Sequence, residues 1–190
     1  GMLVMTAVIA VQGLLFQDGG LVVMGANILN MGLLTAAVGY GLYRSAIGSK
    51  LTTKLTVAGV AAWLSVMTGA LATSLQLWLS GTAHIGIVVP AMLGVHALIG
   101  LGEALVTVAA LSFILRTRPD LLGEQSASAQ GSRGWILTGV LITLAVVLLS
   151  PLASVSPDGL NRVAMDLGFI KAAQSASGPL AGYTVPFLSS

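Results

Sequence analysis

The sequence predicts an all-α membrane protein, a bundle of about five transmembrane helices with a small extracytoplasmic segment at its C-terminal end. Of the 190 residues, 56% are hydrophobic and only 7% are charged, and the mean hydropathy is +0.97. A water-soluble domain needs roughly a quarter of charged residues to cover its surface. The composition therefore excludes a soluble domain.

Apolar runs follow one another along the chain, and a helix needs about 20 apolar residues to cross a bilayer core of about 30 Å. The first run is shorter than this, whereas the others are near or above it. We therefore expect spans at residues 2–16, 21–43, 55–79, 86–115 and 135–153.

Lysine and arginine occur in alternate loops. Three lie between residues 44 and 54 and three between residues 116 and 133, whereas loops 17–20 and 80–85 contain none. By the positive-inside rule the basic loops face the cytoplasm. The first span then exits at Asp18 and the fifth at Pro151, which places the tail outside the cell.

Several classes of function are excluded by what the sequence lacks. There is no cysteine, so disulfides, thiolate metal sites and cysteine nucleophiles are ruled out. The His-Glu-x-x-His, Gly-x-Ser-x-Gly and Gly-x-x-x-x-Gly-Lys patterns are absent. A net charge of +2 is too dilute for a nucleic-acid-binding patch. We do not expect an enzyme, and a nucleotide-driven step would need another subunit.

Polar side chains stand at the entry to the second span. Asp18, Asn27 and Asn30 lie inside or beside an apolar run, in a chain with little other polarity at membrane depth. Burying such groups is costly, so they usually have a role. Gly19 and Gly20 follow Asp18 and suit a turn with positive φ or backbone that lines a cavity.

The two asparagines are three residues apart, so an α-helix places Asn27 and Asn30 on one face, with Met31 adjoining it. They could form hydrogen bonds to neighbouring helices, which contribute about 0.6 kcal/mol each on average. Alternatively, they could surround a bound solute. The residues alone leave both interpretations open.

The fourth span carries a carboxylate in the middle of an apolar run. Glu103 follows His96 by seven residues, which is two turns along one helix face. We expect the two side chains to belong to a polar interior track or to lock a helix interface. The alternative is a satisfied structural pair without a role in transport. We expect His84, in a short outside loop, to be solvated.

The tail contains one further element. Pro157, Asp158 and Gly159 form a turn signal, and residues 160–167 follow a short helical pattern. Asp158 is placed to cap this helix. We therefore predict a compact extracytoplasmic helix.

Three motifs in one order carry a family resemblance: VQGLLFQDGG at 11–20, GANILNMG at 25–32 and PAMLGVHALIGLGEAL at 90–105. Together they resemble CbiM/NikM, the substrate-binding membrane component of cobalt and nickel energy-coupling-factor (ECF) transporters. In addition, SPDGLNRVAMDLGF at 156–169 and PLAGYTVP at 179–186 resemble the extracytoplasmic PDGLE-type segment of the small CbiN/NikN partner. The resemblance covers nearly the whole chain except the linker.

The resemblance implies ATP-driven uptake of Co²⁺ or Ni²⁺ across the plasma membrane of a bacterium or archaeon. The implied partners, besides membrane lipid, are a transmembrane coupling subunit and cytoplasmic ABC-type ATPase subunits that hydrolyse the ATP. The metal ion is the cargo, so we expect no permanently bound cofactor and no nucleic-acid partner. A membrane scaffold or assembly subunit without its own solute site is the alternative.

The resemblance also suggests a division of the chain. We expect residues 1–115 to form the CbiM/NikM-like core, 116–134 a cytoplasmic linker, and 135–190 a CbiN/NikN-like span with its extracytoplasmic segment. In the family, nitrogen ligands from a Met-His-Ile-Pro segment and a later histidine hold the metal, and these are expected upstream of Gly1. We therefore expect a fragment that is truncated at both ends.

Under this interpretation a set of residues in and beside the spans lines the cavity or orients the groups that bind the metal. They are Asp18, Gly19, Gly20, Asn27, Asn30, Met31, His96 and Glu103. Small-residue faces offer contact with the coupling subunit or packing inside the bundle. These faces comprise Ala36, Gly39 and Gly41 in the second span and Ala58, Ala61 and Ala62 in the third.

Overall fold

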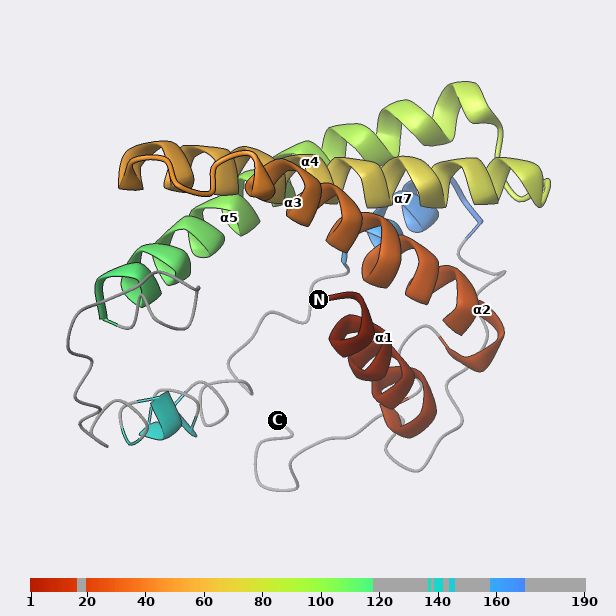
Figure 1. Cartoon of the computed structure of the whole chain (residues 1–190). Coiled ribbons are helices and arrows are strands. Elements are labelled where there is room, and N and C mark those ends of the chain that lie inside the picture. The colour runs from red at the N-terminus through yellow and green to blue at the C-terminus, as the bar shows by residue number, and fades with distance from the viewer. Residues whose placement is uncertain (17–19, 118–136, 138, 142–143, 146–157, 170–190) are drawn as a thin grey trace. The chain divides into compact units, whose positions relative to one another are not determined.

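The computed structural model in Figure 1 describes residues 1–16, 20–117, 137, 139–141, 144–145 and 158–169. Every regular element among these residues is helical, so the predicted all-α class is confirmed. The chain divides into two compact units, Gly1–Ser112 with Pro157–Gly182 and Phe113–Ser156 with Tyr183–Ser190. The elements below belong to the first unit, apart from the last turn of α5. Most of the predicted fifth span lies outside the described residues.

The first two predicted spans form helices with π-helical stretches. Helix α1 (Met2–Val11) continues into the π-helix η1 (Gln12–Phe16). Helix α2 (Gly20–Asn27) continues into the π-helix η2 (Ile28–Leu34) and then into α3 (Thr35–Arg44). The sequence pattern did not predict the π-helices, because neither stretch contains a proline that would mark an irregular turn.

Two long helices and one short helix follow. They are α4 (Leu51–Leu79), α5 (Ile85–Thr117) and α7 (Gly159–Asp166). Among the described residues, Leu21–Arg44, Leu51–Leu79 and Ile85–Thr117 are long and apolar enough to cross a membrane. The helix Met2–Leu15 is shorter. At 1.5 Å per residue it extends only about 20 Å, less than the bilayer core, as expected from its sequence.

The first helical hairpin packs closely because glycines face larger side chains. A Cβ at Gly32 in η2 would lie 3.4 Å from Ile9 Cδ1 of α1, and one at Gly13 in η1 would lie 3.3 Å from Met24 Sδ. The order of these contacts shows that α1 runs antiparallel to the helix that contains η2. Small residues replace the hydrophobic drive that is missing between helices in lipid.

Helix α3 packs along α4, and part of the predicted small-residue faces lies in this interface (Figure 1). A Cβ at Gly39 would lie 3.3 Å from Ser65 Oγ, and that hydroxyl lies 3.1 Å from the Thr35 carbonyl, to which it donates. Ala58 and Ala61 are buried within the chain. These residues therefore pack inside the bundle, whereas Gly41 has no neighbour within 4 Å of a built Cβ.

Helix α5 returns antiparallel to α4 and contacts it through Trp63. The indole Nε1 of Trp63 donates to the Ala97 carbonyl at 3.0 Å. A Cβ at Gly100 would lie 3.0 Å from Trp63 Cδ1, and one at Gly59 would lie 3.0 Å from Val108 Cγ2. Both distances are shorter than ordinary side-chain contacts, so these glycines set the spacing of α4 and α5.

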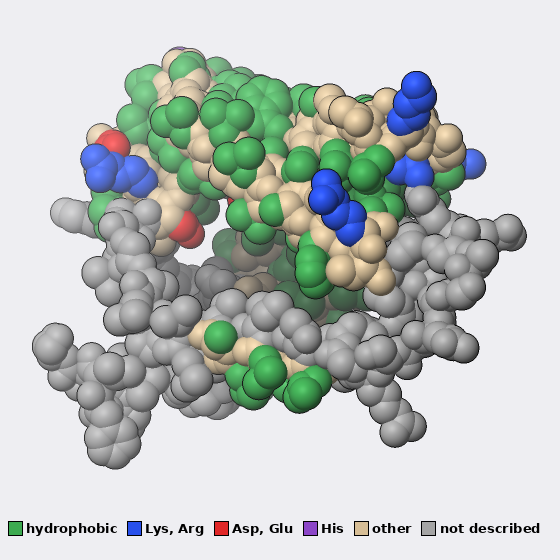
Figure 2. Space-filling model, turned by 90° about the vertical axis from the view of Figure 1, so that its left-hand side faces the viewer, with side chains coloured by type: hydrophobic (Ala, Val, Ile, Leu, Met, Phe, Trp, Pro, Cys, Tyr) green, Lys and Arg blue, Asp and Glu red, His purple; other side chains and the backbone are tan. Residues whose placement is uncertain are grey.

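The outer surface of the described helices is apolar. Figure 2 shows hydrophobic side chains spread over the visible face, with charged side chains in small separate groups. Leu98 and Leu105 of α5 are more than two thirds exposed. Such a surface suits lipid, in agreement with the composition.

We predict that Gly100→Val lowers the thermal stability of the protein in detergent, because the new side chain meets the Trp63 indole. Overpacking of this kind costs typically about 1–3 kcal/mol. Gly102→Val is the matched control, since it lies on the same helix with nothing within 4 Å of a built Cβ. Equal melting temperatures of the two variants would contradict the contact.

Candidate functional site

Asn30 forms the main polar contact between two of the spanning helices. It lies in η2 and is only 3% exposed. Its Nδ2 donates to Gln76 Oε1 at 2.8 Å and to Thr73 Oγ1 at 3.1 Å, while Gln76 Nε2 donates to Asn30 Oδ1 at 2.9 Å. This reciprocal amide pair joins η2 to α4. Asn30 thus forms hydrogen bonds to a neighbouring helix, the first of the two interpretations of the asparagines.

Asn27 does not join this cluster. It is half-buried at the end of α2, and its side chain makes no hydrogen bond to any residue that the structure describes. A π-helix begins at Ile28, between the two asparagines, so the α-helical spacing on which the shared face was predicted does not continue through this stretch. The two asparagines therefore have different surroundings.

The other predicted residues near the second span lie in different places. Met31 is 50% exposed and its carbonyl accepts a hydrogen bond from Thr35 Oγ1 at 2.5 Å. Gly20 begins α2. Asp18 and Gly19 lie outside the described residues. Their roles in a solute cavity stay predictions.

Sequence reasoning missed Thr73 and Gln76. They are three residues apart on α4, so both can reach the same neighbour across one helix interface. The available signal was Gln76, a side-chain amide inside a predicted span, three residues after Thr73, the same spacing as between the two asparagines. Only the antiparallel packing of η2 against α4 shows that Gln76 opposes Asn30.

His96 lies half-buried on α5 beneath the start of α7. Its Nδ1 lies 2.8 Å from the Met92 carbonyl. A carbonyl oxygen only accepts, so Nδ1 carries the proton in this contact. The other ring nitrogen faces Gly159, where a built Cβ would lie 3.0 Å from Nε2 and 2.8 Å from Cε1. The close approach of α7 to the His96 ring therefore requires glycine at position 159.

Glu103 is exposed on α5 rather than enclosed within the described bundle. No hydrogen bond or ion pair joins it to His96 among the residues that the structure describes. The two-turn spacing puts both residues on one side of α5, but the His96 ring contacts the Met92 carbonyl and Gly159 of α7 instead of Glu103. A shared polar track through both residues stays a prediction.

Helix α7 begins and ends with defined caps. Asp158 Oδ1 accepts from the backbone N–H of Asn161 at 2.7 Å, which confirms the predicted N-cap. At the other end Gly168 has φ of 78°, and Phe169 N–H donates to the Ala164 carbonyl at 3.0 Å. This is a Schellman ending. Both ends of the helix are thus fixed by the local sequence.

One face of α7 packs on α5. Val163 is buried with Val88 and Met92, and Leu167 and Phe169 pack against this cluster. The opposite face is exposed and carries the ion pair between Arg162 and Asp166, whose atoms lie 3.2 Å apart. The helix is therefore amphipathic, as its sequence pattern predicts.

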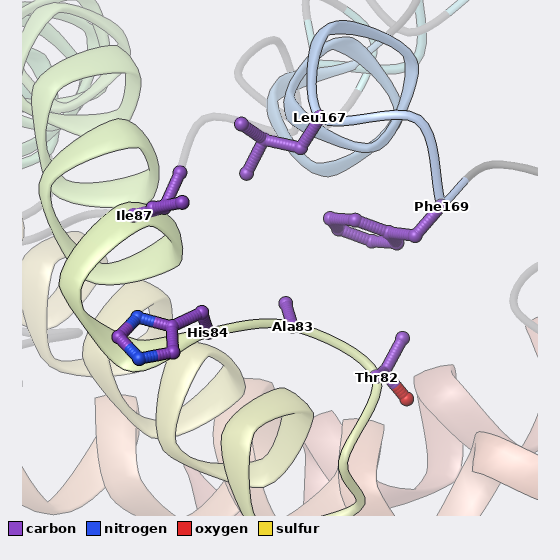
Figure 3. A pocket seen from close by; sticks show the side chains of 6 residues that line it. All are labelled: Thr82, Ala83, His84, Ile87, Leu167 and Phe169. Carbon is purple, nitrogen blue, oxygen red and sulfur yellow. The ribbon is translucent and has the colours of Figure 1, made fainter.

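A shallow pocket of about 180 Å³ lies between the α4–α5 turn and the end of α7. Figure 3 shows Leu167 extending toward Ile87 and the Phe169 ring projecting into the space above Ala83, with the His84 ring beside the start of α5. His84 Nδ1 accepts from the Gly86 N–H at 3.3 Å and the residue is exposed, as expected for a loop histidine. Thr82 and His84 are its polar lining residues, so the pocket offers few groups to fix a ligand.

Metal ligands do not gather in this part of the protein. The residues that the structure describes contain no group of three or more His, Cys, Asp or Glu side chains that could hold a metal ion. The polar groups brought together across helices are instead the amides and hydroxyl around Asn30. Such groups fix helix positions or orient the groups that bind an ion.

Comparison with known proteins gives a family match. Residues 1–121 match CbiM, described as the cobalt uptake substrate-specific transmembrane region. No solved structure matches the chain.

Individual relatives support this match. A fused protein of Archaeoglobus fulgidus named for nickel transport, NikMN, is 30% identical over 190 residues, which cover 99% of this chain and 63% of the relative. LarMN of Lactiplantibacillus plantarum, also a fused protein named for nickel transport, is 34% identical over 164 residues, 79% of this chain and 48% of the relative. The cobalt transport protein CbiM of Sorangium cellulosum is 34% identical over 125 residues, 63% of this chain and 56% of the relative. The chain thus spans about half to just under two thirds of the length of these relatives.

We predict that Gly159→Leu displaces α7 from α5, because the added side chain overlaps the His96 ring. Backbone amides of α7 should then exchange with solvent at least about tenfold faster, since the helix loses the packing that protects it. Asn161→Ala is the control, because that side chain is exposed on the same helix. Unchanged exchange in Gly159→Leu would refute the docked position.

Proposed function

Because this chain belongs to the CbiM family of cobalt uptake substrate-specific transmembrane regions, we propose that it is the substrate-binding membrane component of an ATP-driven ECF-type importer for Co²⁺ or Ni²⁺. The match over residues 1–121 is the single observation that carries the proposal. It includes the stretches 11–20, 25–32 and 90–105, on which the sequence resemblance rests.

The fused relatives support a two-part chain. NikMN and LarMN align over 99% and 79% of this chain, beyond the family match, which ends at residue 121. We propose that residues 1–115 are the CbiM/NikM-like core, 116–134 a cytoplasmic linker and 135–190 the CbiN/NikN-like part. Helix α7 then belongs to the extracytoplasmic segment.

The proposed cargo, Co²⁺ or Ni²⁺, rests on the family match and on the names of the relatives. Co²⁺ and Ni²⁺ favour nitrogen ligands, and the resemblance places these in a segment ahead of α1. Helix α1 runs antiparallel to η2, and a Cβ built at Gly1 would lie 3.9 Å from the Cβ of Ala36. Asp18 and Asn27 lie between α1 and η2 in sequence and would orient the ligands rather than bind the ion themselves.

Energy and release would come from partners. The described helices offer apolar surfaces suited to lipid and to a transmembrane coupling subunit, and the proposed ATPase subunits would act from the cytoplasm. In this arrangement the chain binds and passes the ion and performs no covalent chemistry. Its proposed location is the plasma membrane of a bacterium or archaeon.

We predict that Asn27→Ala and Asp18→Ala each weaken Ni²⁺ or Co²⁺ binding by the complete transport system about 10–100-fold, the usual effect of losing a group that orients metal ligands. Equilibrium binding of the radioactive ions to membranes containing the system measures this. Asn161→Ala, an asparagine on the exposed face of α7, should bind as wild type.

If both variants bound the ions as tightly as wild type, these residues would be removed from the site. If the wild-type system bound and moved neither ion, the transport function itself would be wrong and the scaffold alternative would take its place.

A further inference from the structure

We propose that Gln76 and Thr73 are positioning residues for the transported ion: through Asn30 they hold the π-helical stretch η2 against α4 and so fix where Asn27 stands. This inference rests on the proposed transport function and adds to it. Neither residue belongs to the motifs on which the resemblance rests.

The polar capacity of Asn30 is nearly used up by its two partners on α4. Its amide nitrogen has two N–H groups, and these donate to Gln76 at 2.8 Å and to Thr73 at 3.1 Å. Its oxygen accepts from Gln76 at 2.9 Å. Asn30 therefore has no donor left for a ligand, and it acts on the site through its hold on the backbone.

The π-helical stretch η2 needs support from neighbouring helices. A π-helix is rare and usually occurs as a single turn, whereas η2 extends over seven residues. Asn30 ties it to α4, Gly32 packs it against Ile9 of α1, and Thr35 Oγ1 binds the Met31 carbonyl at its end. Without the tie to α4, the stretch is free to return toward α-helix.

The support of η2 also acts on Asn27. Asn27 immediately precedes η2, so a change of helix type between residues 28 and 34 rotates its side chain about the helix axis relative to α4. Asn27, whose side chain lacks a hydrogen bond to described residues, is thus positioned by Asn30, which is bound to α4. Asn30 is the anchor and Asn27 is the group it places.

The position of the pair along the membrane fits this role. Gln76 lies three residues before the end of α4 at Leu79, a distance of about 5 Å along the axis. The turn that follows is on the outer side by the distribution of Lys and Arg. The pair therefore stands near the side from which an imported ion arrives.

The test uses Gln76→Glu in the complete transport system in membrane vesicles, with Ni²⁺ and Co²⁺ as probes. A protonated carboxylic acid can donate to Asn30 Oδ1 and accept from Nδ2, as the amide does, whereas a carboxylate can only accept. We expect the ion concentration for half-maximal uptake to be raised about tenfold over wild type in mildly alkaline buffer, the effect of losing one or two interhelical hydrogen bonds. This deficit should shrink as the pH falls, with little change in the maximal rate.

A second pair of variants tests the same contact without a new ionisable group. Thr73→Val removes one of the two acceptors for Asn30. On the same helix, Thr68→Val removes a hydroxyl whose partner among the described residues is the Leu64 carbonyl of its own helix. We expect Thr73→Val to raise the half-maximal concentration about threefold and Thr68→Val to leave it unchanged. This pair decides the matter if Gln76→Glu does not accumulate in membranes.

A deficit of Gln76→Glu that is equal at every pH, or identical behaviour of Thr73→Val and Thr68→Val, would overturn the positioning role while leaving transport by the wild-type protein intact. Failure of the wild-type system to move either ion would instead reject the proposed function, and this inference with it.

Discussion

The arrangement of the described helices depends on one constraint, which is that a polar group in an apolar environment must find its partner inside the protein. Asn30 meets this constraint by exchanging hydrogen bonds with Gln76 and by donating to Thr73. No buried side-chain nitrogen or oxygen among the described residues lacks a partner. Because lipid offers no alternative partner, the pairing specifies which faces of η2 and α4 meet.

Around this contact the helices are held by shape rather than by hydrophobicity. Lipid chains are as apolar as leucine, so burying an apolar side chain between helices gains little. The glycines that face Ile9, Ser65 and Trp63 instead allow close van der Waals contact. The indole of Trp63 adds a hydrogen bond to a backbone carbonyl of α5. Close contact between these helices therefore depends on glycine at those three positions.

Helix α7 follows different rules, because its sequence is that of a water-facing element. One face buries Val163 against α5, and the other exposes Arg162 and Asp166 to solvent. The caps at Asp158 and Gly168 are local and predictable. What is not local is the docking of Gly159 on His96, which connects the tail segment to a motif of the transmembrane core.

The sequence by itself determined the membrane class, the helices of the described spans and both the existence and the N-cap of α7, because hydropathy, loop charge and capping act over short distances. It also singled out Asn30. Only the tertiary structure decided that Gln76 and Thr73 are its partners, that Asn27 is separated from it and that Glu103 is exposed. The pairing of Asn30 depends on the antiparallel register of η2 and α4, and the exposure of Glu103 depends on which face of α5 meets its neighbours. Both are set by packing between segments that are distant in the sequence.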